Sequence, residues 1–164
     1  MNVRIVPAGE ERLVDLRDLY LSLHHAELAV SALALTEPDE RAWAARLVTY
    51  RGHFAAGRAR LLLAEDGDRL VGYALGLVGE AHDDTFPLGA RVGELYTLVV
   101  AASARGRGVG TALLEALDTV LLAEGATSLR VEVMAGNEDA LRFYRRHGLV
   151  EGEVVLYRVA PPSA

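Results

Sequence analysis

The fold is decided by residues 93–111, which read GELYTLVV-AASA-RGRGVGT. An apolar stretch typical of a β-strand, residues 94–100, is followed by a glycine-rich turn and then by a helical pattern over Thr111–Leu122. The first turn of a helix carries free backbone N–H groups and a partial positive charge. Glycines let a phosphate approach those groups closely. The stretch therefore predicts that a phosphate-bearing ligand binds at residues 105–111.

Two common phosphate-binding motifs do not fit this loop. A P-loop needs G-x-x-x-x-G-K-[S/T], but all 17 basic residues of the chain are arginine. A dinucleotide-binding motif needs G-x-G-x-x-G, and here Thr111 stands where the third glycine after Gly106 and Gly108 would be. Too few residues follow the loop for the further βα units of that fold. The pattern present is R-x-x-G-x-G, formed by Arg105, Gly108 and Gly110.

Hydrophobic periodicity predicts a mixed sheet with helices on its faces. The expected strands are Val3–Val6, Arg60–Ala64, Leu70–Val78, Leu95–Val100, Leu129–Met134 and Val154–Val159, and the expected helices are Glu10–Ala34, Pro38–Tyr50, Thr111–Leu122 and Asn137–His147. Asp66-Gly67-Asp68 is typical of a hairpin turn. We expect a loop over residues 81–92 and the end of the last helix at Gly148. Because a helix lies between them, the fourth and fifth strands should run parallel.

Length and composition limit the class of protein. The chain has 164 residues, 51% of them hydrophobic and 24% charged, which suits one globular domain over residues 1–160 with a frayed tail over 161–164. The net charge of −6 argues against nucleic acid as a partner. The absence of cysteine excludes disulfides and thiolate metal sites. No apolar run reaches the ~18 residues of a membrane helix, which predicts a cytoplasmic protein with no membrane partner.

These features together resemble the GNAT superfamily of acetyl-CoA-dependent N-acetyltransferases. That family carries [Q/R]-x-x-G-x-[G/A] between its fourth strand and third helix, then an asparagine that opens a later helix containing a Phe-Tyr pair. This chain has Arg105, Gly108 and Gly110, then Asn137, Phe143-Tyr144 and Gly148. The resemblance implies an α/β (α+β) fold with a mostly antiparallel sheet of about seven strands, four flanking helices and splayed parallel strands 4 and 5. Many members have proline where this chain has Ala102. This difference affects the expected stiffness of the loop and not the resemblance itself.

The resemblance also implies how acetyl-CoA binds as the cosubstrate. Its pyrophosphate would lie on the backbone N–H groups of the loop and on the hydroxyl of Thr111, and its pantetheine arm would pair with the strand edge. The residues concerned are Leu98, Val99, Val100, Arg105, Gly106, Arg107, Gly108, Val109, Gly110, Thr111, Asn137 and Tyr144. The N–H of Leu98 would stabilise the oxyanion of the tetrahedral intermediate. The alternatives are a plain tight turn for the glycines and a helix N-cap for Asn137.

Two residues match catalytic positions of the family. Glu94 matches the general-base glutamate of the histone-acetylating branch, which would accept the proton of the attacking amine. Tyr144 matches the tyrosine that protonates the departing CoA thiolate in many members. Each has a structural alternative: a solvated carboxylate at a strand end for Glu94, and core packing for Tyr144. The absence of cysteine favours direct attack in a ternary complex over a ping-pong route through a protein thiol.

The sequence says less about the acceptor. His24-His25-x-Glu27 and His82-Asp83-Asp84 lack the H-E-x-x-H spacing, so we expect no metal. Both groups lie in segments that line the acceptor side in the family, where their carboxylates either suit a cationic amine or are solvated loop charge. The predicted partner is a small-molecule or peptide amine, and analogy with the family allows a homodimer. The alternative functions are a catalytically idle acyl-CoA-binding sensor and an acyltransferase that uses a longer acyl-CoA.

Overall fold

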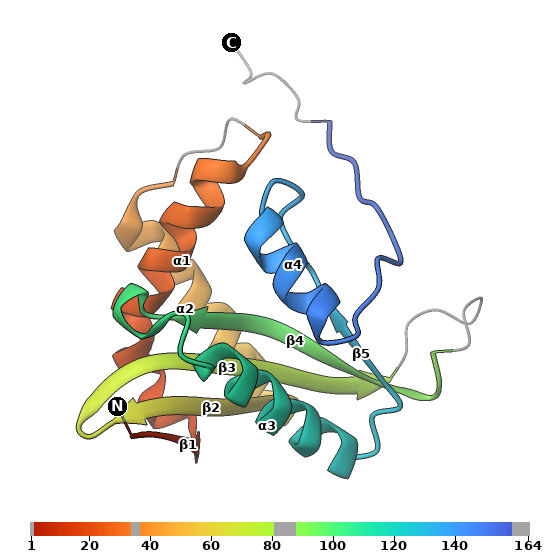
Figure 1. Ribbon diagram of the computed structural model, residues 1–164, viewed down its shortest axis with the longest axis horizontal. Helices are drawn as coiled ribbons and strands as arrows, with labels where there is room; N and C mark the ends of the chain where they lie inside the picture. The colour runs from red at the N-terminus through yellow and green to blue at the C-terminus, as the bar shows by residue number, and fades with distance from the viewer. Residues whose placement is uncertain (1, 34–36, 81–87, 159–164) are drawn as a thin grey trace.

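The computed structural model describes residues 2–33, 37–80 and 88–158 (Figure 1). Over these residues it has a five-stranded sheet in the order β1-β2-β3-β4-β5 and four α-helices. The strands are β1 (Val3–Ala8), β2 (Ala59–Asp66), β3 (Arg69–Glu80), β4 (Arg91–Val100) and β5 (Ser128–Val131); the helices are α1 (Arg17–Val30), α2 (Asp39–Ala55), α3 (Val109–Ala123) and α4 (Glu138–Arg146), with the 3-10 helices η1 (Glu10–Leu16) and η2 (Ala102–Ala104). The pairs β1–β2, β2–β3 and β3–β4 are antiparallel, and β4–β5 is parallel.

The helices cover both faces of the sheet, and each face has its own apolar core (Figure 1). On the face covered by α1 and α2, Leu13, Trp43 and Tyr73 are buried. On the face covered by α3, Leu113 and Leu117 are fully buried. Because β4 and β5 are parallel, their C-terminal ends and the segments that follow them lie at the same end of the sheet.

The hairpin and the parallel pair are confirmed. β2 and β3 pair antiparallel around Gly67, whose φ of +62° is the left-handed conformation that glycine adopts without strain. β1 continues beyond its predicted end at Val6 and includes Pro7. Proline lacks the N–H that a central strand needs, but β1 is an edge strand and has a neighbour on one side only.

Several predicted boundaries are wrong. Across the described residues the sheet has five strands, where about seven were expected. The single helix expected over Glu10–Ala34 is divided into η1 and α1; α1 ends at Val30, and Ala34 lies outside the described residues. β5 ends before Met134, and β4 begins within the segment expected as a loop, of which residues 81–87 lie outside the described part.

The prediction of a strand over Val154–Val159 is also wrong, because residues 154–158 do not form one. Val159 lies outside the described residues. Residues 151–158 form no regular secondary structure. The side chains of Val154 and Leu156 are 85% and 88% exposed, whereas a strand in a covered sheet buries at least one face. Three apolar residues are consecutive here instead of alternating, so the pattern selects no face for burial.

The strand β4 is longer than its parallel partner. The last pair between β4 and β5 joins Leu95 to Val131. Just beyond it Tyr96 forms a bulge, because it has no partner in β3. The rest of β4, up to Val100, pairs with β3 alone. The two parallel strands therefore separate towards their C-terminal ends, at the end of the sheet where the glycine-rich loop begins.

Glycine at position 72 is required for close packing of β3. A Cβ on Gly72 would lie 2.8 Å from the backbone oxygen of Val99, which belongs to the neighbouring strand and cannot move aside. We expect Gly72→Ala to lower the free energy of unfolding by about 1–3 kcal/mol in urea titrations. Gly52→Ala is the matched control, because nothing lies within 4 Å of its Cβ and alanine favours the helix by about 0.5–1 kcal/mol. Equal midpoints for the two variants would contradict this packing.

Candidate active site

The glycine-rich loop presents a row of free backbone donors. Gly106 and Gly108 have φ values of +71° and +80°, which turn the chain sharply between η2 and α3. Gly108 is the N-cap of α3. Within the described residues the N–H groups of residues 106–111 have no acceptor, whereas Arg105 N–H bonds back to Ala102. Such a row at a helix N-terminus is suited to bind an anion.

Two side chains of this loop have partners within the protein. Arg105 donates from Nε to the backbone oxygen of Val100 at 3.0 Å, which fastens the loop to the end of β4. Thr111 Oγ1 lies 3.0 Å from His147 Nε2, and His147 Nδ1 lies 2.8 Å from the oxygen of Phe143. Since Nδ1 donates to that carbonyl, Nε2 of the neutral ring accepts from the Thr111 hydroxyl. Nothing in the sequence had identified His147 as the residue that ties α4 to the start of α3.

The free stretch of β4 directs its backbone towards the opening between the strands. Ala101 donates its N–H to Val71 of β3, so alternate residues back along β4 also face β3. Val99 is one of these. Leu98 and Val100 therefore point their N–H and C=O groups away from β3, to the side that β5 has left. Their orientation is compatible with the pairing of an extended ligand along this edge.

A small pocket of about 70 Å³ lies at this opening, between α1, β4, the segment after β5, and α4. It is lined by Leu23, Glu27, Leu95, Tyr96, Thr97, Leu98, Val131, Glu132, Val133, Met134, Asn137, Ala140 and Tyr144. The two charged residues among them, Glu27 and Glu132, are both acidic. The pocket therefore combines an apolar wall with negative charge, which suits a cationic group joined to a hydrocarbon chain.

Tyr144 and Asn137 enter this pocket from α4. Burial raises the pKa of Tyr144 to about 12, so its phenol is protonated at neutral pH. The ring packs against the core on the α3 side, and within the described residues its hydroxyl has no hydrogen-bond partner. Asn137 accepts the N–H of Ala140 at 3.1 Å, which confirms its role as N-cap. Its side-chain NH₂ is the group left to donate to a ligand.

Glu94 lies on β4 but is not among the residues that line the pocket. Its neighbours Gly93 and Leu95 face the core under α3, so the Glu94 side chain points to the opposite face of the sheet. There one carboxylate oxygen lies 3.9 Å from Nε of Arg130 on β5, and 22% of the side chain is exposed. Its role as the general base stays a prediction.

The comparisons with known proteins agree with this geometry. The model of the acetyltransferase (GNAT) family matches residues 15–149. The chain belongs to the GNAT family. No curated protein matches it at a significant level. Among solved structures, a putative acetyltransferase from Pyrococcus furiosus has a TM-score of 0.79 at 18% identity, covering 97% of this chain and 100% of its own.

Aminoglycoside N-acetyltransferases are also similar to this GNAT chain in structure. One of them, AAC(6')-Iy in complex with CoA, has a TM-score of 0.74 at 18% identity and covers 97% of this chain and 95% of its own. The same enzyme in complex with a bisubstrate analogue, CoA-S-monomethyl-acetylneamine, has a TM-score of 0.72 at 18% identity, covering 98% and 100%. At this level of identity the likeness establishes the fold alone.

In this GNAT fold, the C-terminal half of α1 forms one wall of the pocket. A Cβ on Gly136 would lie 2.4 Å from the backbone oxygen of Val30, so the end of α1 packs directly against the segment between β5 and α4. Leu23 and Glu27 are four residues apart and lie on the same side of α1. The close packing at Gly136 therefore holds these two side chains over the pocket, opposite Tyr144.

Of the two histidines before Glu27, His25 connects the first two helices, and His24 packs within α1. His25 Nε2 lies 2.8 Å from a carboxylate oxygen of Asp39, and this hydrogen bond lowers the pKa of Asp39. The His24 ring stacks on Tyr20 with centroids 5.9 Å apart. No group of three potential metal ligands occurs among the residues that the structure describes, and His82-Asp83-Asp84 lies outside them. Within the same limits, none of the helices is long and apolar enough to span a membrane.

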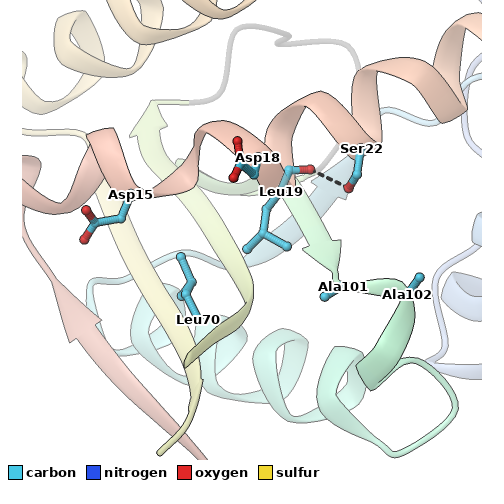
Figure 2. Close-up of a pocket in the computed structure, with 7 residues that line it drawn as sticks. All are labelled: Asp15, Asp18, Leu19, Ser22, Leu70, Ala101 and Ala102. Atoms are coloured by element: carbon cyan, nitrogen blue, oxygen red, sulfur yellow. Dashed lines mark hydrogen bonds between the residues drawn. The ribbon is translucent and has the colours of Figure 1, made fainter. Parts of the chain in front are cut away.

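A second, larger hollow of about 330 Å³ lies between α1 and the segment just after β4 (Figure 2). Its polar wall consists of Asp15, Asp18 and Ser22, and the Ser22 hydroxyl donates to the oxygen of Leu19 at 2.7 Å. Both carboxylates are exposed, and Asp15 is paired with Arg12. Negative charge so close to the loop disfavours a phosphate in this hollow. The smaller pocket beside Tyr144 is therefore the candidate active site.

Proposed function

We propose that this protein transfers an acetyl group from acetyl-CoA to a primary amine, which attacks the thioester directly in a ternary complex. The observation that carries the proposal is one continuous path. The free N–H groups of residues 106–111 lead to the open edge of β4 at Leu98 and Val100, and this edge ends at the pocket that holds Tyr144. The solved GNAT structures with CoA bound support an acyl-CoA as cosubstrate.

Each part of this path has a role in the proposal. The loop N–H groups bind the pyrophosphate, and the dipole of α3 adds to the attraction of its charge. The backbone of Leu98 and Val100 pairs with the pantetheine arm. The N–H of Leu98 lies at the point where β4 and β5 separate, and it stabilises the oxyanion that forms at the thioester carbon.

Tyr144 supplies the proton that the leaving group needs. As the C–S bond breaks, its hydroxyl donates to the CoA sulfur, and the nitrogen of the new amide returns a proton to the phenolate. The chain has no cysteine, so no acyl-cysteine intermediate can form, and this supports direct transfer. The neutral phenol is available over the whole physiological range, because the Tyr144 pKa is raised to about 12.

Two measurements test this function. Calorimetry with CoA and acetyl-CoA should give a Kd in the micromolar range, and a panel of a polyamine, an aminoglycoside, lysine and a peptide N-terminus should release free thiol from acetyl-CoA with at least one amine. Binding without turnover of any amine would favour the idle sensor. Turnover that is faster with propionyl-CoA or butyryl-CoA would favour the longer acyl donor. No heat with either ligand at millimolar concentration would contradict all three functions.

A further inference from the structure

Two carboxylates line the candidate active site, and Glu27 is the one that α1 supplies. It lies in the last third of α1 and lines the pocket together with Leu23, opposite Tyr144 on α4 and Tyr96 on β4. Its side chain is half-buried, and within the described residues it makes no hydrogen bond or salt bridge, although Arg46 and His24 are near enough to lower its pKa. A half-buried carboxylate without a direct hydrogen-bond partner gains stability when a ligand donates to it and brings the opposite charge.

The surroundings of Glu27 adjust its charge from several sides. Burial raises its pKa, while the charge of Arg46 on α2 and the interaction with His24 on α1 act in the opposite direction. Arg46 cannot move away easily, because its guanidinium lies 5.1–5.7 Å from the ring centres of three tyrosines. These are Tyr20, Tyr50 and Tyr96. The result is a carboxylate that is a stronger base than one in water and that lies near a positive charge held in place.

The other two carboxylates nearby are placed differently. Glu94 points to Arg130 and does not line the pocket. Glu132 lines the pocket, but its side chain is 79% exposed and also pairs with Arg130. Both therefore pair with the same cation, Arg130, within the protein. Glu27 is the one of the three that makes no salt bridge within the described residues, so its carboxylate is available to a ligand.

We propose that the Glu27 carboxylate binds the ammonium group of the acceptor and takes its proton, so that the acceptor is a cationic primary amine. This inference rests on the proposed acetyl transfer. It names Glu27 as the proton acceptor in place of Glu94. It also explains why no cationic side chain occurs among the described residues that line the pocket.

The proton and electron balance of the reaction is complete with these residues. The ammonium gives one proton to Glu27 and becomes a neutral amine, whose electron pair forms the N–C bond. The C–S bond breaks, its electron pair stays on sulfur, and Tyr144 protonates that sulfur. The nitrogen gives its second proton to the Tyr144 phenolate, and Glu27 releases its proton to water. One ammonium and one thioester thus yield one amide, one thiol and one proton.

The test compares Glu27→Gln with Glu94→Gln, using the best amine of the panel. We expect Glu27→Gln to lower kcat/KM for that amine by about 100-fold at pH 7.5, since a general base contributes about 10²–10⁴. The Kd for acetyl-CoA should stay within about twofold, and Glu94→Gln should lose less than about fivefold. Glu40→Gln on the exposed start of α2 removes the same charge outside the site and serves as control.

The pH profile and an uncharged nucleophile separate this role from a structural one. In Glu27→Gln, kcat/KM should rise with pH towards the amine pKa of roughly 10, while the wild type levels off at lower pH. With an arylamine, which is uncharged at neutral pH, the loss should shrink to less than about tenfold. Glu27→Asp keeps the charge and should retain more activity than Glu27→Gln, which also guards against a simple folding defect.

The outcomes distinguish the inference from the function on which it rests. If the wild type binds acetyl-CoA but acetylates no amine, the proposed function fails. If the wild type is active and Glu27→Gln keeps the wild-type kcat/KM, the inference is overturned and the function stands. The same holds if Glu27→Gln lowers kcat/KM by the same factor for the charged amine and for the uncharged arylamine. A large loss in Glu94→Gln with none in Glu27→Gln would assign the base to Glu94.

Discussion

Replacing Gly108 by valine should raise the Kd for coenzyme A by about 100-fold. The φ of +80° at this position is strained for any residue with a Cβ and most of all for a β-branched one. Relief of the strain rotates the peptide planes on both sides of Gly108, and their N–H groups then no longer converge on one anion. A hydrogen bond to a charged group contributes about 1.5–3 kcal/mol. Loss of about 2.7 kcal/mol, between one and two such bonds, corresponds to about 100-fold.

Gly57→Val is the matched control for this prediction. Gly57 has a φ of +69°, and nothing lies within 4 Å of a Cβ at either position, so both substitutions introduce backbone strain without a clash. Both variants should therefore lose a similar free energy of unfolding, about 1–2 kcal/mol. Only Gly108→Val should lose heat in calorimetry with CoA. Wild-type affinity in Gly108→Val would show that the pyrophosphate does not lie on this loop.

The elements around the loop were predictable because local chemistry fixes them. The apolar run of β4, the free amides after it and the stripe of leucines in α3 all follow from residues next to one another in the chain. The N-cap at Asn137 and the helix end at Gly148, with a φ of +82°, are equally local. Here the pattern and the structure agree within a few residues.

The errors arise where a distant part of the chain decides the structure. The apolar residues 154–156 have strand propensity, but a strand also needs a paired neighbour, and no periodicity can supply one. The first expected helix is divided into η1 and α1, and Leu13 and Leu16 of η1 are fully buried in the core, where they contact distant parts of the chain. Tertiary contacts, not propensity, set these boundaries.

The same limit applies to the candidate site. The resemblance to the GNAT family placed Glu94 and Tyr144 in the chemistry, but a matching position in a motif does not tell whether the Glu94 side chain lines the pocket. Glu27 was noted beside two histidines and left open between ligand binding and solvated charge. Its position in the pocket depends on the close contact of Gly136 with the end of α1, more than 100 residues later in the chain. Only the folded structure brings these segments together.

Tyr144→Phe should lower kcat by about 100-fold and leave the Kd for acetyl-CoA within about twofold. General acid catalysis contributes about 10²–10⁴, and the thiolate of CoA would have to leave without a proton in the variant. Phenylalanine keeps the ring that packs beside Phe143, with ring centres 5.2 Å apart in the native protein. The lost hydroxyl has no hydrogen-bond partner within the described residues, so the free energy of unfolding should not fall.

The raised pKa of Tyr144 also predicts how the effect of Tyr144→Phe on kcat depends on pH. Burial raises the Tyr144 pKa to about 12, so the protonated acid persists well above pH 9, and Tyr144 causes no fall in kcat below about pH 10. In Tyr144→Phe the leaving thiolate takes its proton from water, so the deficit should be present across the whole range from pH 6 to 9. Tyr157→Phe, which removes a hydroxyl from a side chain that is 71% exposed, should behave as the wild type. If Tyr144→Phe keeps more than half of the wild-type kcat, the role of Tyr144 is limited to packing in the core. The proton must then reach the CoA sulfur by another route.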